Sequence, residues 1–323
     1  MTALVLNPGW TDEFVSEPAT GAHAAEVFGL ICAELISAFG FCPDTAEDVR
    51  AWLEPPETAR SAQLLIRDKD MGALVQWWAA LQDPGAELFH AMIRTEPGFS
   101  EPTGDRLAEA GWATLLDWIR RESAPEQVET VVHSGVANGD EAAARRLRAA
   151  GFTYGRTFWE MSASVADAPH PPAHEAGFTI GATRDAVTVH RILDEAFDGS
   201  WGYETTSFDD WLAVRRSFAG YDPDLWVLAE IDGAAVAAMI MSRRSVDEGS
   251  LYVQELATTA SHRRRGIASS LLRHAFDVAA TEGYAQVNLH VDSSSPDDAP
   301  AVYRRAGFDV RCAYDAFSLS LVP

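Results

Sequence analysis

The segment Leu256–Ser269, which reads LATTASHRRRGIAS, joins a run of strand-forming residues to the start of a helical pattern. The first turn of a helix has backbone N–H groups without intrahelical partners, and the helix dipole adds positive charge there. Such a turn binds phosphate or pyrophosphate directly. Gly266 lets the backbone approach a phosphate without a Cβ, and Ala268 keeps the next turn small.

Three consecutive arginines, Arg263, Arg264 and Arg265, precede this helix. Their guanidinium groups could add charge-assisted hydrogen bonds to phosphate oxygens. A cluster of this kind also occurs as a solvated helix start, but three cations at a helix N-terminus oppose the dipole. The cluster stands out further because the formal net charge of the chain is −23. The pattern therefore predicts a site for a polyanionic ligand.

Strand and helix patterns alternate around this turn. Asp232-Gly233, between two apolar runs, is a strong signal for a two-residue hairpin turn, and Gly283 ends the long helix. We therefore expect an α/β fold, of the α+β kind with a mixed sheet, covered by helices on both faces. The expected strands are 178–181, 225–231, 234–242, 250–258, 285–291 and 317–322, and the expected helices are 185–197, 207–218, 266–281 and 299–306.

The chain contains an internal repeat. Val132–Phe152 and Leu289–Phe308 each run from an apolar strand through a polar loop and a short helix to Ala-Gly-Phe. Upstream of these, Ala24–Trp52 and Val187–Trp211 share a helical run, an Ala-Phe pair, an aromatic–glycine loop and a tryptophan. Two shared segments in the same order predict a duplicated domain.

The predicted domains are 1–165 and 177–323, joined by a linker at 166–176. The linker contains three prolines among small and polar residues, which is typical of an extended connection. The chain has 323 residues, of which 47% are hydrophobic, enough for two cores.

The composition also limits the compartment and the partners. The apolar runs are too short to span a bilayer, and the first ten residues lack a signal-peptide pattern. The three cysteines are odd in number and unevenly spaced, so we interpret each as a small buried hydrophobe in a reducing, cytoplasmic setting. The acidity disfavours nucleic acid and anionic membranes and favours a cationic ligand, although it could serve solubility alone.

The motif Arg263-x-x-Gly266-x-Ala268 after a strand, followed by Tyr303 and then Gly307-Phe308, resembles the GNAT acetyltransferase superfamily. The resemblance is strong over 177–320 and weak in the N-terminal half. It is closer still to the tandem-domain actinobacterial type that includes mycothiol synthase. In those relatives a loop residue eight before the tyrosine is often Asn, and here it is Ser295.

The resemblance implies two tandem GNAT domains and acetyl-CoA as cosubstrate, with no metal. In the family the pantetheine arm fits between two strands that splay apart, and a free amine attacks the thioester directly, without a covalent enzyme intermediate. A backbone N–H of the first strand would stabilise the oxyanion. The arm would be held by the backbone of Leu256, Ala257 and Thr258, and the pyrophosphate by Arg263, Arg264, Arg265, Gly266, Ile267, Ala268 and Ser269.

The same resemblance suggests catalytic residues. Glu255 would be the base that takes the amine proton, or else an ion-paired carboxylate. Tyr303 would be the acid that protonates the departing thiolate, or else a packing aromatic. We interpret His290 as a satisfied strand histidine rather than a base. The loop residues Trp201, Tyr203 and Glu204 would line the acceptor pocket or close the core.

The N-terminal half lacks both signatures. Gly111 and Ala113 echo Gly266 and Ala268, but Ala108 stands at the arginine position and Leu147 at the tyrosine position. We therefore expect this domain to be degenerate and to bind no coenzyme A productively. It would be a scaffold, a wall of the acceptor site or a separate regulator site.

Three functions remain open from the sequence. The first is acetylation of a small amine, either a cationic metabolite or antibiotic, or an aminosugar–cysteine conjugate as in mycothiol synthase. The second is acetylation of a protein or peptide, and the third is a non-catalytic acyl-CoA sensor. A monomer is preferred over a homodimer, because two copies in one chain can imitate a dimer.

Overall fold

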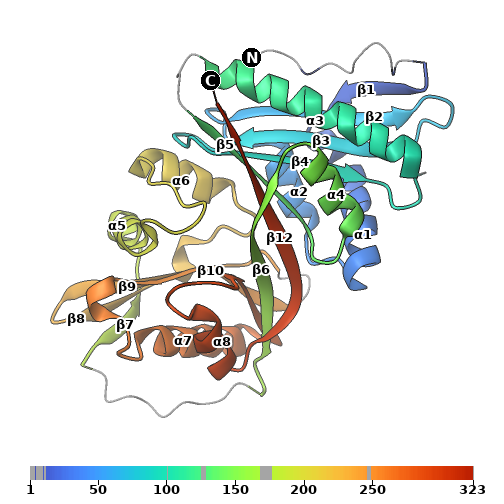
Figure 1. Cartoon of the computed structure of the whole chain (residues 1–323). Helices are drawn as coiled ribbons and strands as arrows, with labels where there is room; N and C mark the ends of the chain where they lie inside the picture. The colour runs from blue at the N-terminus through green and yellow to red at the C-terminus, as the bar shows by residue number, and fades with distance from the viewer. Residues whose placement is uncertain are drawn as a thin grey trace. The chain divides into compact units, whose positions relative to one another are not determined.

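The computed structural model describes residues 4, 10, 12–99, 101–124, 129–167, 177–245 and 249–322. The chain forms two compact units, one of Met1–Arg156 with Tyr314–Pro323 and the other of Thr157–Ala313 (Figure 1). Most of the linker predicted at 166–176 lies outside the described residues.

The N-terminal unit has a mixed sheet in the order β1-β2-β3-β4-β5-β12. Neighbouring strands are antiparallel except β4 and β5, which are parallel. The strands are β1 (Phe14–Pro18), β2 (Arg60–Asp68), β3 (Leu74–Gln82), β4 (Phe89–Thr95), β5 (Thr130–Ala137) and the end of β12 (Asp309–Leu321). The helices are α1 (Ala24–Phe39), α2 (Ala46–Leu53), α3 (Glu101–Ser123) and α4 (Glu141–Ala149).

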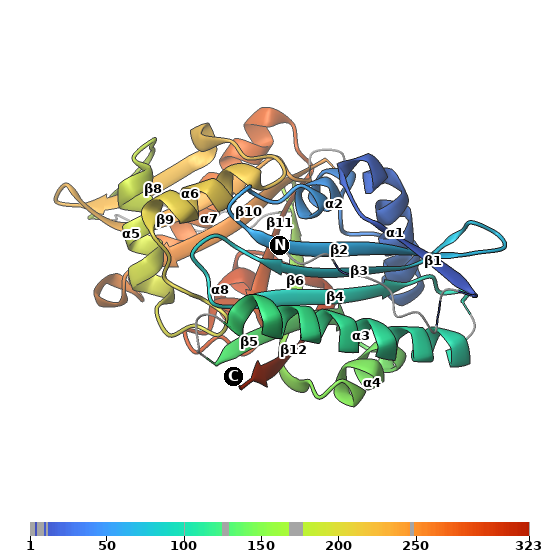
Figure 2. The ribbon, with the colours of Figure 1, turned by 90° about the horizontal axis from the view of Figure 1, so that it is seen from above.

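Helices cover both faces of this sheet, with α1 and α2 on one face and α3 and α4 on the other (Figure 2). Successive side chains of a strand point to opposite faces. The adjacent Trp77 and Trp78 on β3 follow this rule, because Trp77 packs in the α1–α2 core and Trp78 in the α3–α4 core. Both rings are fully buried, and they fill the two cores from a single strand.

The C-terminal unit has a mixed sheet in the order β6-β11-β10-β9-β8-β7, in which only β10 and β11 are parallel neighbours. One core packs α7 and α8 on the sheet, and the other packs α5 and α6 on the opposite face. The strands are β6 (Thr153–Ser164), β7 (Thr179–Ala182), β8 (Trp226–Ile231), β9 (Ala234–Ser242), β10 (Ser250–Thr258) and β11 (Gln286–Asp292). The helices are α5 (Ala186–Phe197), α6 (Phe208–Ser217), α7 (Ile267–Glu282) and α8 (Ala299–Arg305).

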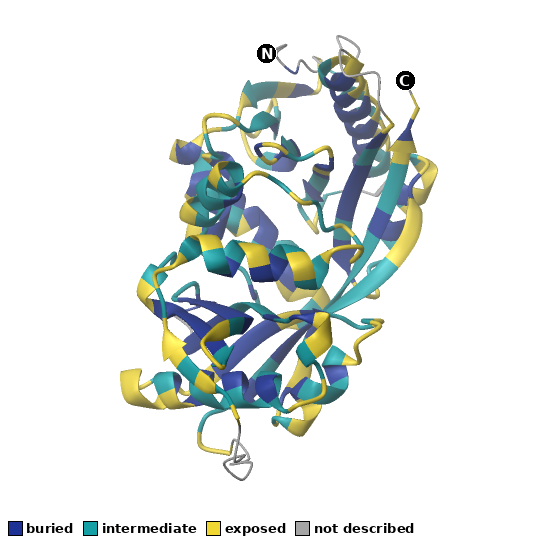
Figure 3. Ribbon diagram, turned by 90° about the vertical axis from the view of Figure 1, so that its left-hand side faces the viewer, coloured by how far each residue is buried: buried dark blue, intermediate teal, exposed yellow. Residues whose placement is uncertain are grey.

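Buried residues are concentrated on the strands and on one side of the covering helices (Figure 3). This pattern is that of amphipathic helices packed on a sheet. The mixed α/β sheet expected from the sequence is therefore confirmed in the second unit and present in the first.

The two sequence repeats exchange their last strands. Each repeat ends in a strand that follows a short helix, which is β6 after α4 in the first repeat and β12 after α8 in the second. β6 nevertheless pairs with β11 of the second repeat, from Phe158 opposite Asp292 to Ser164 opposite Gln286. The end of β12 pairs with β5 instead, from Tyr314 to Leu321. The compact units thus divide at 156/157 and 313/314, and not within 166–176, because these strand pairings join residues far apart in the sequence.

Local signals in the sequence place several element ends correctly. Asp232 and Gly233 form the hairpin turn with φ of 50° and 78°. Ser207 caps α6 by accepting a hydrogen bond from the Asp210 N–H at 3.2 Å. The last strand is longer than expected, since β12 begins at Asp309.

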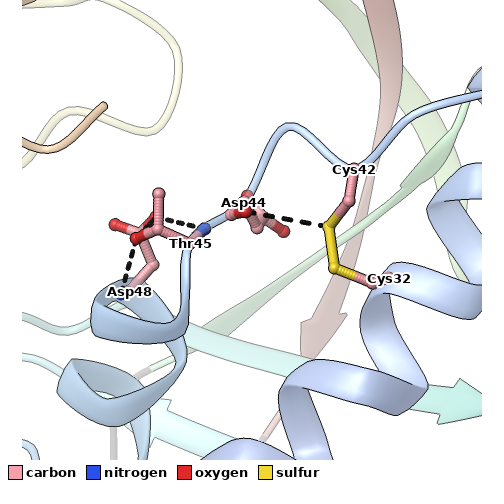
Figure 4. Close-up of a disulfide and its surroundings, with 5 residues drawn as sticks. All are labelled: Cys32, Cys42, Asp44, Thr45 and Asp48. Carbon is pink, nitrogen blue, oxygen red and sulfur yellow. Dashed lines mark hydrogen bonds between the residues drawn. A yellow bond between two sulfur atoms is a disulfide. The ribbon is translucent and has the colours of Figure 1, made fainter. Parts of the chain in front are cut away.

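The cysteine interpretation is corrected by the structure. Cys32 on α1 and Cys42 in the following loop form a disulfide, and Cys312 is buried without one (Figure 4). Beside the disulfide, Thr45 and Asp48 form a reciprocal capping box that starts α2. The disulfide removes the argument for a reducing compartment that rested on three unpaired thiols.

One helical stretch among the described residues, Gly21–Phe39, has the length and the mean hydropathy, 1.5, of a possible membrane span. Its apolar residues Val27, Ile31 and Leu35 pack in the core of the N-terminal unit, which also contains Leu65 and Trp77. This packing is that of an amphipathic helix that covers one face of a sheet.

Gly220, in the connection between α6 and β8, lies where a side chain would meet neighbouring backbone atoms. Its φ is +65°, and a Cβ there would lie 2.3 Å from the Arg244 nitrogen and 2.4 Å from the Arg243 carbonyl carbon. Gly220→Ala should lower the free energy of unfolding by about 3 kcal/mol, from backbone strain together with a backbone clash. Gly233→Ala is the matched control, because φ is +78° but no atom lies within 4 Å. It should cost only about 1 kcal/mol, and equal urea midpoints for the two variants would contradict the assignment.

Candidate functional site

Strands β10 and β11 separate part-way along their length. Their parallel ladder runs from Ser250 opposite Gln286 to Val253 opposite Leu289 and ends there. Beyond this point β10 stays paired with β9, and β11 stays paired with β6. Each strand thus keeps its outer neighbour while the two inner edges separate, which leaves backbone groups available for an extended ligand.

A β-bulge on β10 sets the direction of the next side chains. The register with β9 shifts between Val253 and Glu255. Val253 packs in the core under α7, whereas Ala257 packs in the core under α5 and α6. Because side chains alternate along a strand, the extra residue turns Glu255 toward α5 and α6.

The turn between β10 and α7 presents a row of N–H groups. Arg264 and Gly266 have φ of 66° and 81°, in the left-handed region, and α7 begins at Ile267. The first N–H to join the helix is that of Ser270, which donates to the Gly266 carbonyl at 3.0 Å. Within the described residues, none of the six N–H groups from 264 to 269 donates a hydrogen bond. Such a row at a helix N-terminus is an anion site.

Arg263 is bound within the protein. Its Nε donates to the Thr258 carbonyl at 3.2 Å, its Nη1 to Asp297 Oδ1 at 2.7 Å, and its Nη2 to the Ala196 carbonyl at 3.1 Å. The side chains of Arg264 and Arg265 are exposed. The three arginines of the motif therefore differ in their surroundings.

Glu255 forms a buried ion pair with Arg215 of α6. The two side chains are 15% and 12% exposed. Burial raises the pKa of Glu255, and the charge of Arg215 opposes that increase. Glu255 Oε2 is buried and has no hydrogen-bond partner among the described residues. The carboxylate thus has one oxygen engaged by Arg215 and one buried without a hydrogen-bond partner among the described residues.

Tyr203 lies near this ion pair. Its hydroxyl donates to Asp194 Oδ1 at 2.6 Å. Burial, this hydrogen bond and the charges of Asp194 and Glu255 all raise the pKa of Tyr203. Trp201, from the same loop, contacts Phe158 of β6, with ring centroids 5.8 Å apart. Three loop residues were predicted to line the acceptor pocket. Of these, Tyr203 lies close enough to Glu255 to feel its charge, Trp201 packs on β6, and Glu204 is half-buried.

Tyr303 is on α8, and only 8% of the residue is exposed. Its ring packs against Phe308, with centroids 6.0 Å apart. Burial raises the pKa of Tyr303 to about 12. Its hydroxyl makes no hydrogen bond to the described residues, so a protonated phenol is available as a donor.

The sequence reasoning missed Arg215 and Asp194, which hold Glu255 and Tyr203. Both lie on helices whose patterns were read only for packing, and an acidic or basic residue on a surface helix carries no signal of its partner. The structure also gives His290 partners. Its Nδ1 is hydrogen-bonded to the Tyr252 hydroxyl, and its Nε2 lies 3.4 Å from Glu160 Oε2. These contacts favour the interpretation of a satisfied strand histidine.

The equivalent place in the N-terminal unit is acidic. The parallel pairing of β4 and β5 covers only Phe89 opposite Val132 and His90 opposite His133. A cavity of about 450 Å³ lies at the ends of these strands. Its charged lining consists of Glu34, Glu96, Asp140, Glu141 and Arg146. Net negative charge at this position opposes binding of a pyrophosphate.

Two details of this unit depart further from the cofactor motif. The N-terminus of α4 is capped by Asp140, which accepts from the Ala143 N–H at 2.9 Å. Gly111 and Ala113, the echo of Gly266 and Ala268, lie inside α3 and not at its start. A Cβ at Gly111 would lie 2.7 Å from the Trp78 ring, so this glycine serves close helix–sheet packing.

Residues 187–308 match the family model described as the acetyltransferase (GNAT) family. Two curated relatives are the mycothiol acetyltransferases of Clavibacter sepedonicus, 30% identical over 203 residues, and of Clavibacter michiganensis subsp. michiganensis, 29% identical over 205 residues. Each match covers 60% of this chain and 63% or 62% of the relative, so less than two thirds of each relative is spanned.

Solved structures extend the likeness to the whole chain. A GCN5-related N-acetyltransferase from Sphaerobacter thermophilus is 26% identical, with a TM-score of 0.77 and 97% of both chains covered. A tandem GNAT protein from the clavulanic acid biosynthesis pathway is 14% identical, with a TM-score of 0.69, covering 96% of this chain and 99% of that one. The second likeness shows the fold, and it is that of two GNAT domains in tandem.

The ion pair between Glu255 and Arg215 predicts a pH-dependent stability. Arg215→Met should lower the free energy of unfolding at pH 7 by about 3 kcal/mol, because it leaves a buried carboxylate unpaired. Glu255 would then hold a proton in the folded state well above its ordinary pKa of 4.5. The folded state binds more protons than the unfolded one in that window, so stability should fall as the pH rises, by up to about 1.4 kcal/mol per pH unit.

Urea midpoints between pH 5 and pH 8 measure this slope. Arg184→Met is the matched control, since Arg184 is 75% exposed in its ion pair with Asp224. An Arg215→Met variant with the same pH slope as that control would show that Glu255 is not held by Arg215.

Proposed function

We propose that this chain, whose residues 187–308 match the model of the GNAT family of acetyltransferases, transfers an acetyl group from acetyl-CoA to the primary amine of a small molecule. The observation that carries this proposal is the row of six unpaired N–H groups at 264–269, which lies where β10 leads into α7. The gap left by the parting strands begins upstream of this turn on β10, after Val253.

The residues of the turn fit the diphosphate of coenzyme A. The N–H groups of 264–269 and the guanidinium groups of Arg264 and Arg265 would bind its oxygens. The backbone of Leu256, Ala257 and Thr258, beyond the end of the β10–β11 ladder, would bind the pantetheine arm. Acetyl-CoA supplies an activated acyl thioester, and the chain supplies orientation and proton transfer.

Glu255 and Tyr303 would handle the protons. The attacking amine must lose a proton, and Glu255 would accept it through its unpartnered Oε2, directly or through a water. The charge of Arg215 favours the ionised carboxylate and opposes the larger effect of burial, which raises the pKa of Glu255. The sulfur that leaves as the carbon–sulfur bond breaks would take a proton from the Tyr303 hydroxyl. A backbone N–H of β10 would stabilise the negative charge on the carbonyl oxygen.

The surroundings of Glu255 favour a cationic acceptor. Tyr203 donates to Asp194, and the charges of Asp194, Glu255 and Arg215 all act on its hydroxyl, with Arg215 as the compensating positive charge. The net charge of −23 attracts cations over a longer range. A cationic metabolite or antibiotic amine is therefore our first candidate. We propose that the chain acts as a monomer, without a metal.

The identity to mycothiol acetyltransferases favours a second candidate, an aminosugar–cysteine conjugate as the acceptor. Release of free thiol from acetyl-CoA, followed over a panel of amines, distinguishes the two. Turnover with cysteine-bearing aminosugars alone would support the second candidate, and turnover with polycationic amines alone the first. Thiol release with neither, together with acetyl-CoA binding, would support a non-catalytic sensor.

Acetyl-CoA binding tests the turn directly. Calorimetry should give one acetyl-CoA per chain, because the acidic cavity of the N-terminal unit opposes a second. Gly266→Val, and Arg264→Gln combined with Arg265→Gln, should each weaken binding by about 10- to 100-fold, since they block or remove charge-assisted contacts. Glu96→Gln in the N-terminal cavity is the control and should leave the affinity unchanged. Unchanged affinity in the turn variants would refute the site.

Tyr303→Phe separates catalysis from binding. Loss of the proton donor should lower kcat by about 100-fold or more, while the Kd of acetyl-CoA stays close to that of the wild type. The ring remains in place, so its packing against Phe308 is kept. Initial rates of thiol release and calorimetry measure the two effects. A variant with normal turnover would assign Tyr303 to packing alone.

A further inference from the structure

Arg263 has a different role from the two arginines that follow it. All three of its guanidinium nitrogens donate to protein acceptors, namely Thr258, Asp297 and Ala196. Arg264 and Arg265 make no hydrogen bond or ion pair with the described residues. The first arginine is therefore already occupied, while the other two are available to an anion.

The three partners of Arg263 lie on three segments that carry the proposed site. Thr258 is the last residue of β10, beyond the end of the ladder with β11. Ala196 is in the last turn of α5, from which the chain enters the loop of Tyr203. Asp297 is in the loop that leads from β11 into α8, the helix of Tyr303.

The chemistry of these contacts suits a residue that holds its three partners in fixed relative positions. A guanidinium is planar, with five donors in fixed directions, so three acceptors bound to it are fixed relative to one another. Its positive charge also suits the carbonyl end of α5. Arg263 and Asp297 are 32% and 49% exposed, and pairs so exposed add little to overall stability. The carboxylate of Asp297 already accepts from Nη1, so a phosphate at that nitrogen would have to compete with it.

We infer that Arg263 is a positioning residue, which holds the Tyr203 loop and the segment leading to Tyr303 against the end of β10, and is not a phosphate ligand. This inference rests on the proposed function for its kinetic consequence alone. The geometry that it describes exists whether or not an acceptor is acetylated.

Kinetics in the full chain test the role in turnover. Arg263→Gln should lower kcat by about 10- to 100-fold, because small displacements of reacting groups have effects of that size. The KM and Kd of acetyl-CoA should stay near the wild-type values. Arg265→Gln should show the opposite split, with weaker acetyl-CoA binding. Arg263→Lys should not restore kcat, since an ammonium cannot reach three acceptors in different directions. Arg184→Gln controls for the loss of a surface arginine.

A double-mutant cycle tests the contact with Asp297. Asp297→Ala alone should lower kcat, and Arg263→Gln should then add little, because both changes break one connection. Asp297→Asn keeps an acceptor for Nη1 and should lower kcat less. If Arg263→Gln is too unstable to assay, the Asp297 variants measure the same connection. Additive effects of Arg263→Gln and Asp297→Ala would overturn the inference.

Hydrogen exchange gives a readout that needs no acceptor. Amides in 198–207 and 293–298 should exchange faster in Arg263→Gln, but not in Arg265→Gln or Arg184→Gln. Normal exchange in Arg263→Gln, with acetyl-CoA affinity lost as in Arg265→Gln, would make Arg263 a phosphate ligand and overturn the inference. A wild type that acetylates no amine yet shows the predicted exchange would refute the proposed function and leave the positioning role standing.

Discussion

The end of the ladder between β10 and β11 is the constraint on which the site depends. Two parallel strands can part only if each keeps a hydrogen-bonded neighbour on its other side, since unpaired buried backbone groups are costly. β9 provides this for β10, and β6 provides it for β11 as far as Asp292. β6 comes from the first repeat, so the strand exchange supplies the pairing that lets β11 leave β10. The first repeat thereby contributes a strand to the second sheet.

The two repeats share this plan and differ in charge. In each, a pair of parallel strands loses its ladder after a few residues. In the second repeat the strands lead to a turn with free N–H groups and exposed arginines. In the first, carboxylates dominate the charged lining of the cavity, and Asp140 already satisfies an N–H of α4. The two repeats therefore share a strand arrangement, but the groups at the strand ends favour an anion in the second repeat and oppose one in the first.

Features that depend on neighbouring residues could be predicted from the sequence, and features that join distant residues could not. The Asp232-Gly233 turn and the Ser207 cap follow from local backbone chemistry, and both were found. The strand exchange and the Cys32–Cys42 disulfide depend on which segments meet in space. Gly111 echoes Gly266 in sequence only, because a glycine needed for packing on Trp78 has the same appearance in sequence as one needed at a phosphate turn. The site residues Glu255 and Tyr303 were named from a resemblance, and their roles stay predictions.

The roles proposed for these two residues place opposite demands on their pKa values. A base must be ionised to accept a proton, and an acid must keep its proton until the transition state. Burial alone would raise both pKa values and so favour the protonated form of each. Tyr303 is left with burial alone, and its pKa of about 12 keeps the phenol protonated. Glu255 also has Arg215 beside it, whose charge favours the carboxylate and opposes burial, while burial remains the larger effect and raises the pKa of Glu255. Arg215 on α6 is therefore the feature that would let Glu255, unlike Tyr303, act as a base. The proposed site then depends on the packing of α6 against the sheet.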